Sequence, residues 1–178
     1  MSSINLVILG SLLNGEKSAY EMVREFENWN IGHWVKISNP SIYKNIIKLH
    51  KSGYLNARTV KEGEMPEKTM YEINDAGRAH FYELMEENAA DFSGVYFDFS
   101  AFIVNLYHMP EDEKRKLVAH FKASMDEKKR MMDDVYEQEI KKGRPGHVTE
   151  LVELYKEIYG LLHKWSADLQ KKMDRDND

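Results

Sequence analysis

The chain opens with two stretches whose apolar residues repeat at helical spacing. Residues 4–13 carry a broad apolar stripe that an Asn-Gly pair ends at Gly15, which predicts a mostly buried first helix. Ser18, with Glu21 three residues later, is typical of a capping box at a helix start. The sequence therefore predicts a second helix that begins after Ser18 and frays near residue 28.

A third helix is indicated over residues 40–52, with suitable chemistry at both ends. Asn39 is expected to cap it, Pro40 suits the first helical position, and Gly53 suits the stop. Its buried face is expected to hold Ile42, Tyr43, Ile46, Ile47 and Leu49 or His50. The polar residues of this helix are then left on the opposite face.

The spacing of apolar residues changes from helical to alternating after this helix. Residues 54–60 and 68–73 alternate by two, and the segment between them contains Gly and Pro, which predicts a β-hairpin. A further helix over residues 76–87 follows, capped by Asn74 or Asp75. The order helix-helix-helix-hairpin-helix is that of a winged helix-turn-helix domain.

The second half of the chain lacks strand-like alternation and is expected to be all helical. Pro110 is expected to start one of its helices, with acidic residues in the first turn. The predicted fold is therefore mostly α with a small β-hairpin wing. Residues 1–90 are expected to form the winged helix-turn-helix domain and residues 91–178 a helical dimerisation domain.

The last helix carries the most regular pattern in the sequence. Seven apolar residues follow one another in alternating steps of three and four: Val148, Leu151, Tyr155, Ile158, Leu162, Trp165 and Leu169. Such a seam is typical of helices that pack along their length. Additional apolar positions beside it widen the stripe, so we expect this helix to contact both its own chain and a second copy.

Charge is distributed unevenly along the chain. The net charge is −5, yet residues 28–61 contain no Asp or Glu. The same segment carries six basic residues: Lys36, Lys44, Lys48, Lys51, Arg58 and Lys61. A phosphate backbone responds to the local field rather than to the total charge, so this block is a candidate for nucleic-acid binding. The alternative is a chance clustering of lysines on a solvated face.

The third predicted helix is the candidate recognition helix. Its outer face is expected to present Ser41, Lys44, Asn45, Lys48 and Lys51. The first three are expected near base edges in a major groove, and the lysines can also reach phosphates. An ordinary amphipathic helix with a lysine-rich outer face would show the same pattern. The segment from Lys61 to Lys68 is the expected wing, although its glutamates weaken contact with DNA.

Four blocks of sequence together resemble the PadR family of bacterial transcriptional regulators: residues 6–13, 18–22, 41–55 and 70–78. The resemblance implies a homodimeric winged-helix repressor or activator with C-terminal helices for dimerisation and, in some members, effector sensing. It also implies DNA-side roles for Tyr20, Ser41, Tyr43, Lys44 and Lys68. The chain departs from the family pattern at Ala19 and at Glu67-Lys68, and the second departure puts wing affinity in doubt.

An aromatic run lies near the junction of the two halves. A small aromatic or phenolic effector could bind beside its rings, with Tyr96, Phe99, Phe102 and His108 as the candidate pocket residues. Packing of these rings into an ordinary core is the alternative.

Several classes of protein are disfavoured by composition. At 178 residues the chain suits one domain or two small ones, and its lack of cysteine removes disulfide and thiolate chemistry. No common catalytic, metal or dinucleotide motif occurs, so we expect no enzyme activity, cofactor or metal. The sequence also lacks a signal-peptide pattern and a long apolar span, so a cytoplasmic location is expected.

These patterns favour a sequence-specific DNA-binding transcriptional regulator that acts as a homodimeric repressor on a palindromic operator. The alternative is a winged-helix protein-interaction module in which the basic helix docks an acidic partner and no DNA is bound.

Overall fold

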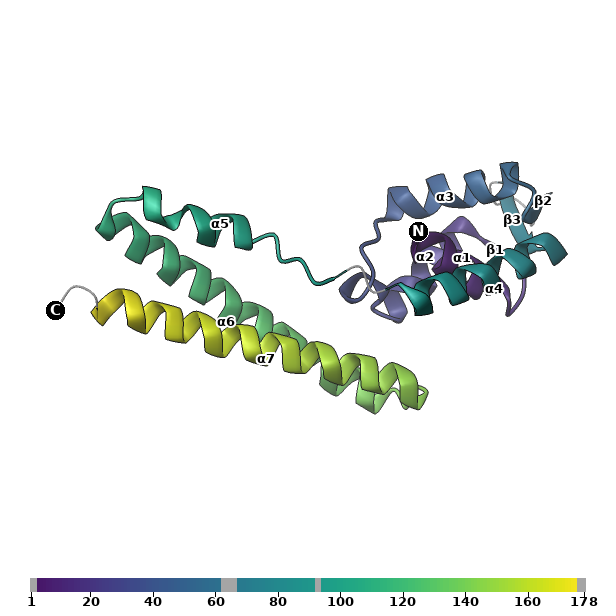
Figure 1. Ribbon diagram of the computed structural model, residues 1–178. Coiled ribbons are helices and arrows are strands. Elements are labelled where there is room, and N and C mark those ends of the chain that lie inside the picture. The colour runs from purple at the N-terminus through teal and green to yellow at the C-terminus, as the bar shows by residue number, and fades with distance from the viewer. Residues whose placement is uncertain (1–2, 62–66, 92–93, 176–178) are drawn as a thin grey trace. The chain divides into compact units, whose positions relative to one another are not determined.

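Four α-helices, a short 3-10 helix and three strands make up the described part of the first half of the chain (Figure 1). The structure is a computed structural model that describes residues 3–61, 67–91 and 94–175. It forms two compact units, residues 1–95 and 96–178. The domain limits expected from the sequence, 1–90 and 91–178, stay a prediction.

The first unit buries one core between its helices and its sheet. The helices are α1 (Ser3–Leu12), α2 (Ala19–Asn28), η1 (Ile31–His33), α3 (Asn39–Lys51) and α4 (Asp75–Ala90). Apolar side chains from each α-helix and from both hairpin strands meet in this core, and Ile8, Leu9 and Met22 are fully buried. The helical spacing of these residues therefore produces one shared apolar centre.

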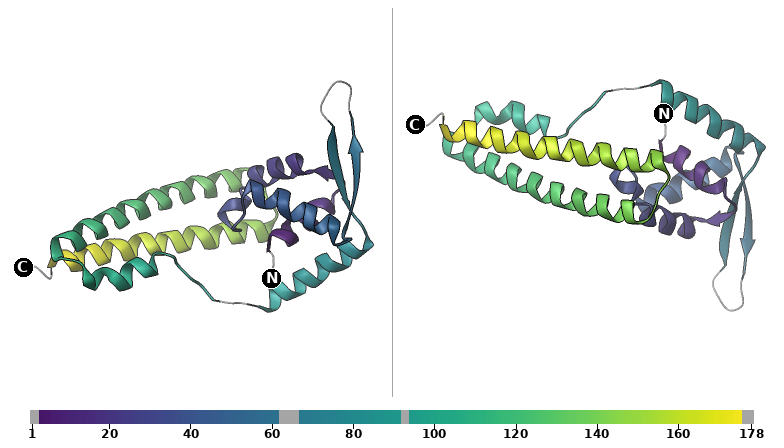
Figure 2. Two further views of the ribbon diagram at one scale, coloured as in Figure 1. Left: turned by 90° about the horizontal axis from the view of Figure 1, so that it is seen from above. Right: turned by 90° about the horizontal axis from the view of Figure 1, so that it is seen from below.

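The sheet holds the predicted hairpin and one strand that the sequence did not indicate. Its strands are β1 (Lys17–Ser18), β2 (Leu55–Val60) and β3 (Lys68–Ile73), in the antiparallel order β1-β3-β2. Figure 2 shows β2 and β3 running side by side as a ribbon. A strand as short as β1 cannot display an alternating pattern, which explains why only the hairpin was predicted.

Two expectations for α3 were wrong. Ser38, rather than Asn39, caps the helix: Ser38 has an extended backbone, and Asn39 is already helical. Ser38 and Ser41 form a reciprocal capping box, which satisfies two N–H groups at once. Ile47 and Tyr43 are 45% and 43% exposed instead of buried, because the core contacts only the face that carries Ile42, Ile46 and Leu49. By contrast, the predicted Ser18–Glu21 capping box of α2 is confirmed, and Asn74 caps α4.

The second unit is helical throughout its described regular elements. It contains α5 (Ser100–Asn105), η2 (Leu106–His108), α6 (Glu111–Lys141) and α7 (Gly146–Arg175). The long helices α6 and α7 pack side by side as an antiparallel hairpin (Figures 1 and 2). Pro110 directly precedes α6, as predicted. Along the described residues, no helix combines the length and apolar character needed to cross a membrane.

Candidate nucleic-acid interface

One face of α3 packs into the core and leaves the other face open. Ile42, Ile46 and Leu49 are at most 2% exposed. The outer face of α3 consists of Tyr43, Lys44, Ile47, Lys48 and Lys51, all of which are exposed. Among the residues that the structure describes, neither Lys44 nor Lys48 takes part in an ion pair. Both ammonium groups are therefore available to an external anion.

Two predicted base-reading residues already have partners within α3. The Ser41 hydroxyl donates to the Ser38 carbonyl at 2.6 Å and accepts the Ser38 N–H at 2.9 Å. The Asn45 side-chain amide donates to the Ser41 carbonyl at 2.7 Å. These bonds would compete with base edges for the same donors, whereas Lys44 has no such competitor.

Three of the residues with expected DNA-side roles lie around one open hollow. It lies between the start of α2, α3 and β3, has a volume of about 910 Å³, and includes Tyr20, Tyr43 and Lys68 in its lining. Tyr20 is 61% exposed and Tyr43 is 43% exposed, so both rings are accessible. The structure thus brings together three residues that lie far apart in the sequence.

A carboxylate partly offsets the positive charge of this hollow. Glu21 lines it, and its carboxylate lies 3.6 Å from the Lys68 ammonium. The backbone N–H of Ser18 donates to this carboxylate, which lowers the pKa of Glu21, and the charge of Lys68 lowers that pKa further. Sequence reasoning identified Glu21 as a cap residue but missed its pairing with Lys68, since the two residues are brought together only by the pairing of β1 with β3.

Arg58 on β2 is held by an acidic residue of the turn before β1. Its Nε donates to Glu16 at 2.8 Å, and a second guanidinium nitrogen bonds the other carboxylate oxygen. This pairing lowers the pKa of Glu16 and raises the pKa of Arg58. Arg58 therefore links β2 to the turn before β1, and it is not an unpaired cation. The wing residues Glu62 and Glu64 lie outside the described residues.

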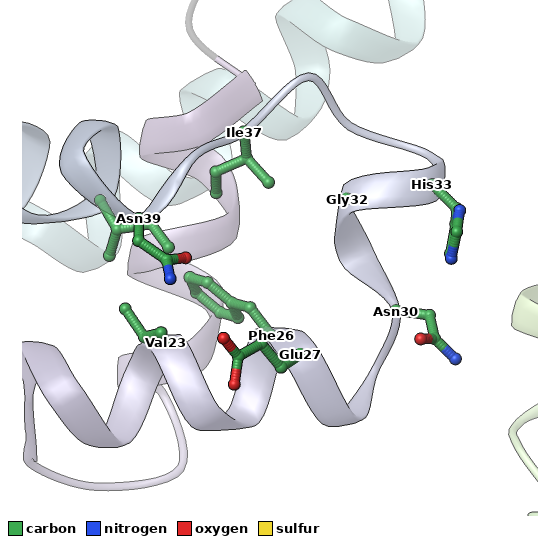
Figure 3. A pocket seen from close by; sticks show the side chains of 9 residues that line it. Val23, Phe26, Glu27, Asn30, Gly32, His33, Ile37 and Asn39 are labelled. Carbon is green, nitrogen blue, oxygen red and sulfur yellow. The ribbon is translucent and has the colours of Figure 1, made fainter.

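A second, smaller hollow of about 300 Å³ lies between α2 and the start of α3. Figure 3 shows Val23, Phe26 and Ile37 around it, with the side chain of Asn39 beside them, while the His33 side chain points away. Its lining combines the apolar residues Val23, Phe26, Ile37 and Ile42 with the polar residues Glu27, Asn30, His33 and Asn39.

The predicted dimerisation seam on α7 is divided between two faces. Val152 and Ser166 are fully buried, while Val148, Tyr155, Leu162 and Leu169 are partly buried. A second apolar row lies on a different side; we call it the outer stripe of α7, and it consists of Leu151, Leu154, Ile158, Leu161 and Trp165, of which all but the partly buried Ile158 are exposed. Leu161 is 67% exposed. Three of the seven predicted seam residues therefore lie in the outer stripe.

The four candidate effector residues lie in two different environments. Phe99 and Phe102 belong to an aromatic cluster, with ring centroids 5.0 Å and 5.6 Å from Phe121. Tyr96 is 87% exposed, and His108 is also exposed. The structure therefore packs the two phenylalanines together and leaves the two polar residues on the surface.

The chain matches known proteins in both sequence and fold. Residues 8–83 match the transcriptional regulator PadR-like family. The negative transcriptional regulator PadR of Bacillus subtilis is 30% identical over 83 residues, which are 47% of this chain and 45% of that protein. The sequence match thus spans about half the length of this curated relative.

Two crystal structures of Bacillus subtilis PadR resemble the full fold. The structure in complex with operator DNA has a TM-score of 0.81 at 21% identity, covering 97% of this chain and 98% of the other. The structure in complex with p-coumaric acid has a TM-score of 0.73 at 17% identity, covering 98% of each chain. These likenesses confirm the predicted fold, a winged helix with a helical C-terminal half.

Proposed function

We propose that the chain, whose residues 8–83 match the PadR-like family of transcriptional regulators, is a sequence-specific DNA-binding repressor. The observation that carries this proposal is the outer face of α3. It presents two unpaired lysines, Lys44 and Lys48, within a segment that lacks acidic residues. A helix with this charge and exposure suits the major groove of DNA.

The contacts divide into two groups. Four side chains would bind phosphate oxygens. Tyr20 and Tyr43 would do so through hydroxyls at the hollow, and Lys48 and Lys68 through their ammonium groups. Lys44 would read base edges, and Ser41 and Asn45 would do so after exchanging their internal hydrogen bonds. Phosphate contacts supply affinity, whereas base contacts supply sequence preference.

We propose a homodimer as the DNA-binding species. The outer stripe of α7 is an apolar row with the three-and-four spacing of helices that pack along their length. A two-fold dimer would place two copies of α3 on equivalent half-sites, so the operator would be palindromic.

We also propose a small aromatic or phenolic effector that binds beside Phe99 and Phe102. The nearby Trp165 ring, 5.7 Å from Phe99, would report binding through its fluorescence. Titration with p-coumaric acid as the probe should change this emission and weaken DNA binding. The titration would use a variant in which Trp29 and Trp34 are replaced by Phe, so that only Trp165 contributes to the emission. An unchanged emission would contradict the proposal.

Selection of bound sequences from a random duplex pool tests the proposed function. The wild-type protein should enrich sequences that share an inverted repeat, and its affinity for them should fall steeply with salt. A protein-interaction module would enrich no sequence and show no salt-dependent affinity for duplex DNA. Placing the selected site over a promoter then tests repression, which requires less transcription in the presence of the protein.

A further inference from the structure

Ile47 is an apolar residue exposed on the outer face of α3. Its side chain is 45% exposed, while Ile46 beside it is 1% exposed. Core packing within the first unit therefore does not account for Ile47. Helix stability does not account for it either, because β-branched residues are weaker helix formers than Lys, Arg or Ala.

The neighbours of Ile47 on the helix surface place it within the basic face. Residues three and four positions apart are surface neighbours on a helix, so Ile47 is surrounded by Tyr43, Lys44, His50 and Lys51. All four are exposed. Ile47 is therefore an apolar side chain surrounded by residues that suit binding to a polyanion. An apolar contact between two proteins is not usually surrounded by lysines in this way.

DNA offers one apolar group in the major groove, the C5 methyl of thymine. We propose that Ile47 determines specificity by packing against a thymine methyl in each half-site; this inference rests on the proposed DNA-binding function. Ser41 and Asn45 are already hydrogen-bonded within α3, so few free polar groups are available for base reading. An apolar contact complements the single free reader, Lys44, without needing a hydrogen-bond partner.

Replacing thymine by deoxyuridine removes this methyl group and leaves every Watson–Crick hydrogen bond in place. We would scan single thymine-to-deoxyuridine changes through one half-site of the selected duplex. The change at one position should weaken wild-type binding about fourfold. This factor corresponds to the loss of about 0.8 kcal/mol for one buried methyl group. The other positions should change binding much less.

The variant Ile47→Ala should abolish this dependence. It should bind the thymine duplex about as weakly as it binds the deoxyuridine duplex, because the side chain that contacts the methyl is gone. Alanine is a better helix former at this exposed position, so the variant should fold, as circular dichroism can verify. Lys48→Ala is the matched control: it should weaken both duplexes equally and keep the fourfold difference between them.

Two results would overturn the inference while leaving DNA binding intact. In one, the wild type binds every deoxyuridine duplex as tightly as the thymine duplex. In the other, Ile47→Ala keeps the wild-type difference, which would assign the methyl contact to another side chain. If the wild type instead shows no salt-dependent duplex binding, the proposed function itself fails, and that result is distinct from both.

Discussion

The Lys68 ammonium lies 3.6 Å from the carboxylate of Glu21, so the partner of Ser18 in the capping box of α2 also pairs with the lysine at the start of β3. Both side chains line the hollow that contains Tyr20 and Tyr43. A phosphate entering this hollow would compete with Glu21 for Lys68. The capping interaction and the proposed DNA contact are therefore coupled through one carboxylate.

Glu21→Gln should strengthen DNA binding. Glutamine can still accept the N–H bond of a capping box, but it neither repels phosphate nor neutralises Lys68. We expect affinity to rise about two- to fivefold at low salt, the size typical of a partly exposed charge pair. Glu86→Gln on α4 is the control for net charge. Equal gains from the two variants in a shift assay would count against the local role of Glu21.

The same residue predicts a pH dependence of stability. The pKa of Glu21 is lowered below 4.5 in the folded protein, so its stabilisation is present above pH 4.5 and is lost as the pH falls through the lower folded value. Wild type should exceed Glu21→Gln by about 0.5–1 kcal/mol in free energy of unfolding at pH 7. In urea titrations this excess should shrink progressively as the pH falls below 4.5; a pH-independent difference would refute this assignment.

Gly77→Ala should destabilise the first unit. A Cβ at Gly77 would lie 2.2 Å from the Tyr54 carbonyl oxygen and 2.8 Å from an Ile73 side-chain carbon. Backbone would have to move, at a cost of about 2 kcal/mol or more in unfolding free energy. Gly160→Ala in α7 is the control: nothing lies within 4 Å of its Cβ position, so alanine should stabilise the helix by about 0.5–1 kcal/mol. Thermal unfolding of both variants separates the two effects.

Leu161→Asp should weaken dimerisation without unfolding α7. Leu161 is 67% exposed in the single chain, so a carboxylate there is solvated in the monomer and buried only in the proposed dimer. Sedimentation should show a shift to monomer at micromolar concentration, together with loss of operator binding. Lys164→Asp, an exposed change outside the outer stripe, should leave the dimer intact. A monomeric wild type would remove the basis for the outer stripe as an interface.

Local chemistry was sufficient to predict much of the first unit. Ser18 with Glu21 specified the start of α2, and the change from helical spacing to alternation specified β2 and β3. The start of α3 was misplaced because Ser38 and Asn39 are both good cap residues. Only the backbone conformation and the reciprocal bonds with Ser41 distinguish them.

The remaining features depend on contacts between distant residues. Ile46 and Ile47 have the same side chain, and helical spacing alone did not exclude Ile47 from the buried face. In the structure only Ile46 packs into the core. The Glu21–Lys68 pair depends on β1 joining β3, and the division of the α7 seam depends on which face α6 covers. No short sequence pattern contains that information.

The salt dependence of operator binding tests the central claim most directly. Lys48 and Lys68 would neutralise about four phosphates in a dimer, so log affinity should fall against log salt with a slope of about −3.6. Lys48→Ala should reduce the magnitude of this slope by about 2, one phosphate per protomer, whereas Arg58→Ala should change it little because Arg58 is paired with Glu16. A slope shallower than about −2, or one unaffected by Lys48→Ala, would contradict docking of α3 on the DNA backbone.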